Sequence, residues 1–87
     1  MHDDENYRYV AKNRCIDLTP MENSILAILI KNKGNLVTFE TLCLLVYKEM
    51  PDIWLKNNLR THMARLRKKL KGEIQIMSKR DKGYYIY

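Results

Sequence analysis

The chain has 87 residues, the length of a single domain with one modest hydrophobic core. With 46% hydrophobic and 30% charged residues, its composition is that of a folded globular domain rather than a disordered chain. The net charge of +6 is uneven, because residues 56–82 hold ten Lys/Arg and only two Asp/Glu. Such a positive field attracts polyanions, but charge alone leaves a nucleic-acid partner and a merely solvated basic face equally open.

Composition argues against catalysis, metal binding and membrane insertion. The two cysteines and two histidines lack the spacing of a structural zinc site. The chain has no glycine-rich phosphate loop and no serine–histidine–acid set, so we expect neither an enzyme nor a cofactor. The longest apolar run, Ile25–Ile30, is too short to span a bilayer, and the N-terminus does not resemble a signal peptide. A cytoplasmic location is therefore expected.

The N-terminal region predicts a tail followed by a hairpin. Residues 1–6 are expected to form a disordered acidic tail, and the folded domain is expected to span residues 7–87. Partial alternation of apolar and polar residues predicts two short strands, at 7–10 and 14–18, that pair as a β-hairpin.

Capping residues predict where the first two helices begin and end. Thr19 and Glu22 form a capping box around Pro20, and the helix that they open is expected to end near Gly34. Thr38 is the expected N-cap of a second, shorter helix, which ends before Pro51.

A third helix is predicted from about Trp54 to Leu70, followed by a second hairpin. Four apolar residues recur at spacings of four, three and four and form one stripe: Leu59, Met63, Leu66 and Leu70. Strands are expected at 74–76 and 84–87, with a basic turn between them. The predicted fold is therefore α+β, a winged helix-turn-helix with a short N-terminal β-hairpin, three helices and a C-terminal β-hairpin wing.

The side of the third helix opposite its apolar stripe carries residues that read duplex DNA. Arginine can bridge two acceptors of guanine, asparagine can bridge adenine, and threonine can contact a base or a phosphate. No acidic residue lies between Lys56 and Lys71, whereas a helix stabilised by its own surface ion pairs would include Asp or Glu. An external anion is therefore favoured for this set: Asn57, Asn58, Arg60, Thr61, Ala64, Arg65 and Lys68.

The turn of the second hairpin carries three further cations, Lys79, Arg80 and Lys82. A basic hairpin tip can enter a minor groove, where a narrow groove attracts arginine through its negative potential. An ordinary polar turn would also be charged, so this signal gains weight only from its place after a basic helix.

The sequence resembles the OmpR/PhoB-type winged-helix effector domain of bacterial response regulators from about Leu18 to Tyr87. The similarity lies in Leu18-Thr-Pro-Met-Glu22, Val37-Thr38, His62, the run Leu66-Arg-Lys-Lys-Leu70, Ser78-Lys-Arg80 and Gly83-Tyr84. The resemblance implies a transcription factor that binds direct-repeat sites through the major groove, and a loop, here Glu49–Leu55, that contacts RNA polymerase.

The resemblance, combined with the outward side of the third helix, assigns three kinds of DNA contact. Base contacts are expected from Asn58, Arg60, Thr61 and Arg65. Phosphate contacts are expected from Tyr47, Asn57, His62, Arg67, Lys68, Ser78 and Tyr84. Minor-groove contacts are expected from Lys79, Arg80 and Lys82.

This sequence departs from the family pattern at several positions. Asn23 replaces a large apolar residue, Asp81 replaces a common wing glycine, Arg60 replaces a frequent acid and Ala64 replaces a frequent base. The N-terminal sheet is expected to have two strands instead of four. No receiver domain is present, so the chain is either a fragment of a longer regulator or a stand-alone relative.

The leading hypothesis is sequence-specific binding of double-stranded DNA by a monomer that pairs on its site. A winged helix used only for protein–protein interaction would show an apolar patch on the third helix. RNA binding would favour exposed aromatic residues for stacking.

Overall fold

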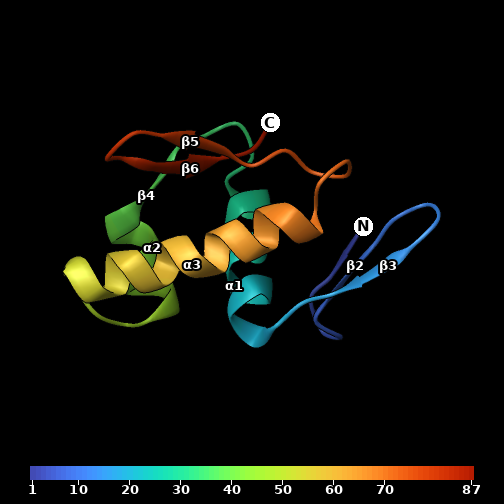
Figure 1. Ribbon diagram of the computed structural model, residues 1–87, viewed down its shortest axis with the longest axis horizontal. Helices are drawn as coiled ribbons and strands as arrows, with labels where there is room; N and C mark the ends of the chain where they lie inside the picture. The colour runs from blue at the N-terminus through green and yellow to red at the C-terminus, as the bar shows by residue number, and fades with distance from the viewer.

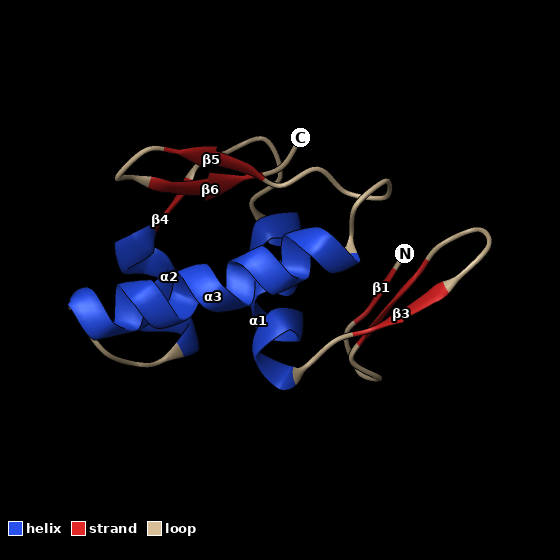
Figure 2. Cartoon of the chain, viewed as in Figure 1, coloured by secondary structure: helices blue, strands red, loops and turns tan.

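The computed structural model describes residues 1–87, with three helices between two small antiparallel sheets (Figures 1 and 2). The helices are α1 (Pro20–Lys31), α2 (Phe39–Val46) and α3 (Ile53–Lys69). The strands are β1 (His2–Asp3), β2 (Arg8–Val10), β3 (Cys15–Asp17), β4 (Val37–Thr38), β5 (Met77–Lys79) and β6 (Gly83–Tyr85). None of the helices is long and apolar enough to cross a membrane. The predicted winged-helix fold is confirmed.

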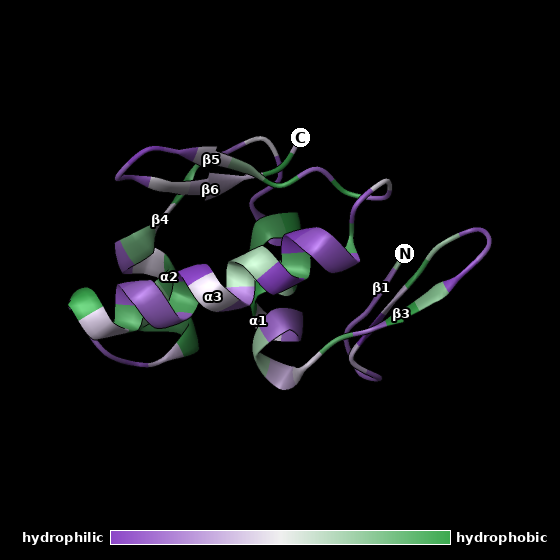
Figure 3. Ribbon diagram, in the orientation of Figure 1, coloured by the Kyte–Doolittle hydropathy of each residue, from purple (hydrophilic) through white to green (hydrophobic).

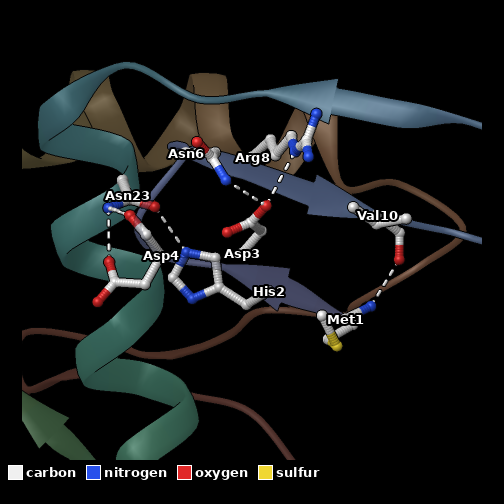
Figure 4. Close-up of polar contacts among 8 residues, drawn as sticks. All are labelled: Met1, His2, Asp3, Asp4, Asn6, Arg8, Val10 and Asn23. Atoms are coloured by element: carbon white, nitrogen blue, oxygen red, sulfur yellow. Dashed lines mark hydrogen bonds and ion pairs between the residues drawn. The ribbon is translucent and has the colours of Figure 1, made fainter.

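The first residues are not a disordered tail, and in this respect the prediction was wrong. Strand β1 pairs with β2, and β2 pairs with β3, so the N-terminal sheet has three strands instead of two. The buried side chain of Asn23 on α1 supplies the polar partners that hold this segment (Figure 4). Its amide nitrogen donates to Asp4 Oδ1 at 2.6 Å, and its Oδ1 lies 2.7 Å from His2 Nε2. Tertiary hydrogen bonds can thus order an acidic, polar segment whose sequence has no apolar pattern to predict a strand.

Local capping chemistry determines where the helices begin, as predicted. Thr19 and Glu22 form a reciprocal capping box at the start of α1, and Thr38 accepts a hydrogen bond from the Thr41 backbone at the start of α2. Gly34 has a φ of +87°, the left-handed conformation expected just after the end of α1. Asp52 caps α3 by accepting from the Leu55 backbone N–H at 2.8 Å.

A single core lies between the three helices and the C-terminal sheet. The four residues of the predicted stripe on α3 are all at most 1% exposed, which confirms that face as the buried one. They pack against Ile25, Leu26 and Leu29 of α1 and Leu42 of α2. The core therefore fixes which side of α3 remains available to a partner.

The C-terminal sheet has three strands in the order β4-β6-β5, because the short strand β4 before α2 pairs with β6. Strand β4 was not predicted. Residues 74–76, predicted as a strand, are loop, because pairing with β6 begins only at Met77, although Ile76 in this loop is 2% exposed and belongs to the core. The hairpin strands are instead Met77–Lys79 and Gly83–Tyr85, with Ser78 opposite Tyr84. The pairing of β4 with β6 ties the wing to the start of α2.

The C-terminal end of α3 is attached to the N-terminal half of the chain by charged side chains. Lys69 Nζ lies 2.6 Å from Glu22 Oε1 and donates to the Asp17 carbonyl at 3.1 Å. Arg14 donates to the carbonyls of Lys69 and Lys71 at 3.2 and 3.0 Å, where a cation also complements the helix dipole. These contacts hold the C-terminal end of α3 against strand β3 and the start of α1.

We expect the Glu22–Lys69 pair to make stability depend on acid pH. Burial raises the pKa of Glu22, but hydrogen bonds from Lys69 and the Thr19 backbone outweigh burial, so the pKa lies below its ordinary value of 4.5. Because the pKa of Glu22 is lower in the folded protein than in the unfolded chain, the ionised carboxylate stabilises the fold at pH values above its ordinary pKa. This stabilisation is lost as the pH falls through the pKa of the folded protein. Glu22→Gln should therefore unfold more easily in urea at pH 7, with a flatter acid dependence.

Asp3 is the matched control, because its pKa is also lowered, by hydrogen bonds from Asn6 and Arg8, but its side chain is only half-buried, whereas that of Glu22 is fully buried. Asp3→Asn should change the urea midpoint much less than Glu22→Gln. Equal acid sensitivity in the wild-type protein and Glu22→Gln would show that the buried pair does not control this transition.

Candidate nucleic-acid interface

Helix α3 presents a cationic side to solvent because its apolar stripe is buried in the core. The expected contact residues Asn57, Asn58, Arg60, Thr61, Arg65, Arg67 and Lys68 are exposed, and His62 is half-buried. The side chains of Arg65, Arg67 and Lys68 form no hydrogen bond or ion pair within the chain, so their donors are free for an anion. Lys69, the next residue, is engaged with Glu22 and does not belong to this set.

Aromatic packing from α2 restrains one edge of this surface. The Arg60 guanidinium carbon lies 5.1 Å from the centroid of the Phe39 ring, and Lys56 Nζ lies 5.9 Å from it. Arg60 also donates to Asn57 Oδ1 at 3.3 Å. A stacked arginine loses less side-chain freedom on binding than a free one. Sequence reasoning missed Phe39, since a buried aromatic at the start of a helix looks like ordinary core.

Besides Arg60, two further side chains of the expected base-contact set already have hydrogen-bond partners within the chain. The Tyr47 hydroxyl donates to Asn58 Oδ1 at 2.6 Å, and Thr61 donates to the Asn57 carbonyl at 3.1 Å. A threonine that bonds back to the preceding turn keeps its lone pairs and methyl group for a partner, but not its proton.

Tyr84, an expected phosphate contact, lies mostly in the core. Its side chain is 6% exposed, and its ring meets the Phe39 ring edge-on at 5.4 Å. Burial raises the pKa of Tyr84, and the positive charges of Arg60 and Arg67 partly oppose this effect. The phenol therefore keeps its proton at neutral pH, close to two exposed arginines.

The wing places its cations at an exposed turn. Figure 1 shows the β5–β6 turn at the same end of the molecule as the first turns of α3, and Figure 3 shows this turn as hydrophilic. The Arg80 side chain is 96% exposed, and its Nε lies 4.0 Å from the exposed Asp81 carboxylate. Asp81 has a φ of +59°, a conformation that glycine adopts without strain. Ser78, Lys79 and Lys82 are exposed as well.

The structure contains no group of three or more His, Cys, Asp or Glu side chains that could hold a metal ion. Away from the two chain ends, the most exposed large apolar side chains lie in the α2–α3 loop and the first turn of α3. Met50 is 61% exposed, Ile53 69% and Trp54 79%. The start of α3 is correspondingly green in Figure 3.

Comparison with known proteins agrees with this architecture. The sequence model of the family "Transcriptional regulatory protein, C terminal" matches residues 13–86. A search of curated protein sequences found no match. The C-terminal domain of the nisin resistance regulator NsrR, a lantibiotic response regulator, has a TM-score of 0.79 at 29% identity, over 93% of this chain and 84% of that one.

Two further solved structures share the fold at lower identity. The DNA-binding domain of Bacillus subtilis CssR has a TM-score of 0.74 at 22% identity, over 92% of this chain and 99% of that one. The DNA-binding domain of the response regulator AdeR, solved in complex with an intercistronic region, has a TM-score of 0.78 at 22% identity, over 99% and 91%. With its caps, buried α3 stripe and basic wing, the chain belongs to the family of transcriptional regulatory protein C-terminal domains, the winged-helix effector domains of OmpR/PhoB type.

Proposed function

We propose that this domain binds double-stranded DNA sequence-specifically and thereby regulates transcription, with α3 in the major groove and the β5–β6 wing at the minor groove. The observation that carries the proposal is the exposed side of α3. It has no acidic residue between Lys56 and Lys71, and three of its cations have no partner within the chain. The AdeR domain, which shares the fold, was solved with DNA. A duplex-binding role places the domain in the bacterial cytoplasm and involves no catalysis.

The side chains divide by what they offer to DNA. Base contacts are assigned to Asn58, Arg60, Thr61 and Arg65, near the middle of α3. Phosphate contacts are assigned to Asn57, His62, Arg67, Lys68, Ser78 and Tyr84, around that centre. Lys79, Arg80 and Lys82 on the wing are assigned to the minor groove, where Arg80 has the reach and the freedom to enter.

Arg65→Ala and Arg67→Ala should have different effects on DNA binding. A site is first selected from random duplexes with the wild-type domain, and dissociation constants are then measured on that site and on unrelated duplexes. Arg65→Ala should weaken binding to the selected site by about 1–3 kcal/mol and relax the sequence preference at one base pair. Arg67→Ala should weaken all duplexes alike and reduce the salt slope by about one unit, because a phosphate contact carries no sequence information.

Both arginines are exposed, so the free energy of unfolding of each variant should lie within about 0.5 kcal/mol of the wild-type value. If the wild-type domain selects no sequence, the proposed function fails. If the two variants show the same specificity profile, the assignment of base and phosphate contacts fails.

We further propose that the free domain is a monomer and that two copies assemble on direct repeats. The fold buries one small core, and no large apolar face is left on the N-terminal sheet for a stable dimer. Sedimentation velocity should show a monomer without DNA and a 2:1 complex on a site with two repeats. A tight dimer without DNA would contradict this arrangement.

A protein partner is supported at the loop between α2 and α3. Met50 in this loop and Ile53 and Trp54 in the first turn of α3 are strongly exposed apolar side chains, away from the cations farther along α3. We propose that this loop, Glu49–Leu55, contacts RNA polymerase while the domain is on DNA. A module that only binds protein is the second candidate, and these exposed apolar side chains favour it. In that case Trp54→Ala would abolish partner binding in a protein that binds no duplex.

A further inference from the structure

Among the expected base contacts, only Asn58 has its end group hydrogen-bonded by another element of the fold. Tyr47 is the C-cap of α2, and its hydroxyl donates to Asn58 Oδ1 at 2.6 Å across the α2–α3 loop. Arg60 and Thr61 have hydrogen-bond partners only within α3, and Arg65 has none. The ring of Tyr47 is half-buried and packs against the core, so the hydroxyl is held on a fixed platform.

We propose that Tyr47 is a specificity-determining positioning residue: it holds the Asn58 amide so that its nitrogen, a donor, faces the bases. The proposal rests on the proposed DNA-binding function and changes the role expected for Tyr47, which was a phosphate contact. A phenol has a single proton, and here Asn58 accepts it. While that bond is made, Tyr47 cannot also donate to a phosphate.

The consequence for base recognition follows from the groups that face the major groove. Guanine presents N7 and O6, adenine presents N7 and thymine presents O4 as acceptors, whereas cytosine presents only the N4 donor. A free asparagine can rotate its amide to satisfy either kind of group. An asparagine whose oxygen is held by Tyr47 offers its nitrogen instead, so it discriminates against cytosine at the contacted position.

Tyr47 suits this role because it remains neutral at ordinary pH. Burial of the phenol and the nearby Cys43 raise the pKa of Tyr47. The hydroxyl therefore stays a donor, and the direction of the hydrogen bond does not change in the neutral range.

Tyr47→Phe tests the proposal because it keeps the ring and removes only the hydroxyl. On the selected site it should weaken binding about 2–10-fold, the range for loss of one neutral hydrogen bond. Selection from random duplexes should show that cytosine becomes tolerated at one base pair, with the other positions unchanged. In the Asn58→Ala background, Tyr47→Phe should change the affinity less than about twofold, because the two residues act as one unit.

Asn58→Asp provides a gain-of-preference test that does not depend on loss of binding. One carboxylate oxygen can still accept from Tyr47, and the other then faces the DNA as an acceptor. The preference at the same base pair should shift toward cytosine, whose N4 group donates. Adding Tyr47→Phe should weaken this shift.

The proposal is overturned if Tyr47→Phe and Asn58→Ala act independently, or if Tyr47→Phe weakens all duplexes alike and reduces the salt slope. The latter result would restore Tyr47 as a phosphate contact. Thermal unfolding of each variant shows whether the fold is kept, and Asn58→Asp decides the matter if Tyr47→Phe is unstable. Failure of the proposed function is a separate outcome, since the wild-type domain would then select no sequence.

Discussion

Gly83→Ala is expected to destabilise the domain by about 3 kcal/mol, at the upper end of the range for steric overpacking. Gly83 lies on β6 opposite Thr38 of β4, where the two backbones approach closely. An alanine Cβ at this position would overlap the Val37 carbonyl oxygen and lie 2.8 Å from Thr38 Cα. Both obstacles are backbone atoms, so no side-chain rotation can relieve them. The β4–β6 pairing would have to open, as is expected where a strand glycine marks close backbone contact.

Urea unfolding measures this effect, and Gly72→Ala is its control. Gly72 has a φ of +88° but has nothing within 4 Å of the position of a Cβ, so alanine there should cost only about 1 kcal/mol. Because the wing depends on the β4–β6 pairing, Gly83→Ala should also weaken DNA binding. Equal stability losses for the two variants would mean that β6 does not need a glycine for space.

DNA affinity is expected to fall about 250- to 1000-fold between 50 and 200 mM salt. If about four to six phosphates are neutralised, log K should fall against log salt with a slope of roughly −4 to −5. The exposed cations without a buried partner supply these contacts, on α3 and on the wing. Fluorescence anisotropy with a labelled duplex at several salt concentrations gives the slope directly.

Two adjacent lysines give a matched control for the salt experiment. Lys68 is exposed and unpaired, whereas Lys69 is held by the buried carboxylate of Glu22. Lys68→Gln should reduce the slope by about one unit, while Lys69→Gln should lower stability and leave the slope unchanged. A flat salt response in the wild-type domain would be incompatible with the DNA-binding proposal.

The two lysines show how tertiary contacts divide a run of like charges into separate roles. Arg67, Lys68 and Lys69 look equivalent in the sequence, yet one of them is a structural cation. Its partner Glu22 is 47 residues away and was recognised from the sequence only as part of a capping box. The same carboxylate caps α1 and pairs with Lys69, and the second role cannot be read from the local sequence pattern.

Local interactions within the sequence determined the helices of this protein and the buried side of α3. Thr19 and Thr38 cap helices with groups three residues away, and the stripe of α3 depends only on the helical period. The cationic side of α3 follows from the same period, which is why most of the candidate interface could be predicted. The basic turn of the wing was likewise visible, because turn residues and charge are local properties.

Tertiary structure alone decided that the first residues are ordered, that each sheet has a third strand, that Tyr47 holds Asn58 and that Arg60 lies over the Phe39 ring. Strand β1 depends on Asn23, β4 on β6, and the orientation of Asn58 on Tyr47. Each of these contacts joins residues that are eleven or more positions apart, so their pairing depends on how the helices pack. Short strands of two or three residues have too few side chains to show a pattern, and they form because the neighbouring backbone satisfies their hydrogen bonds.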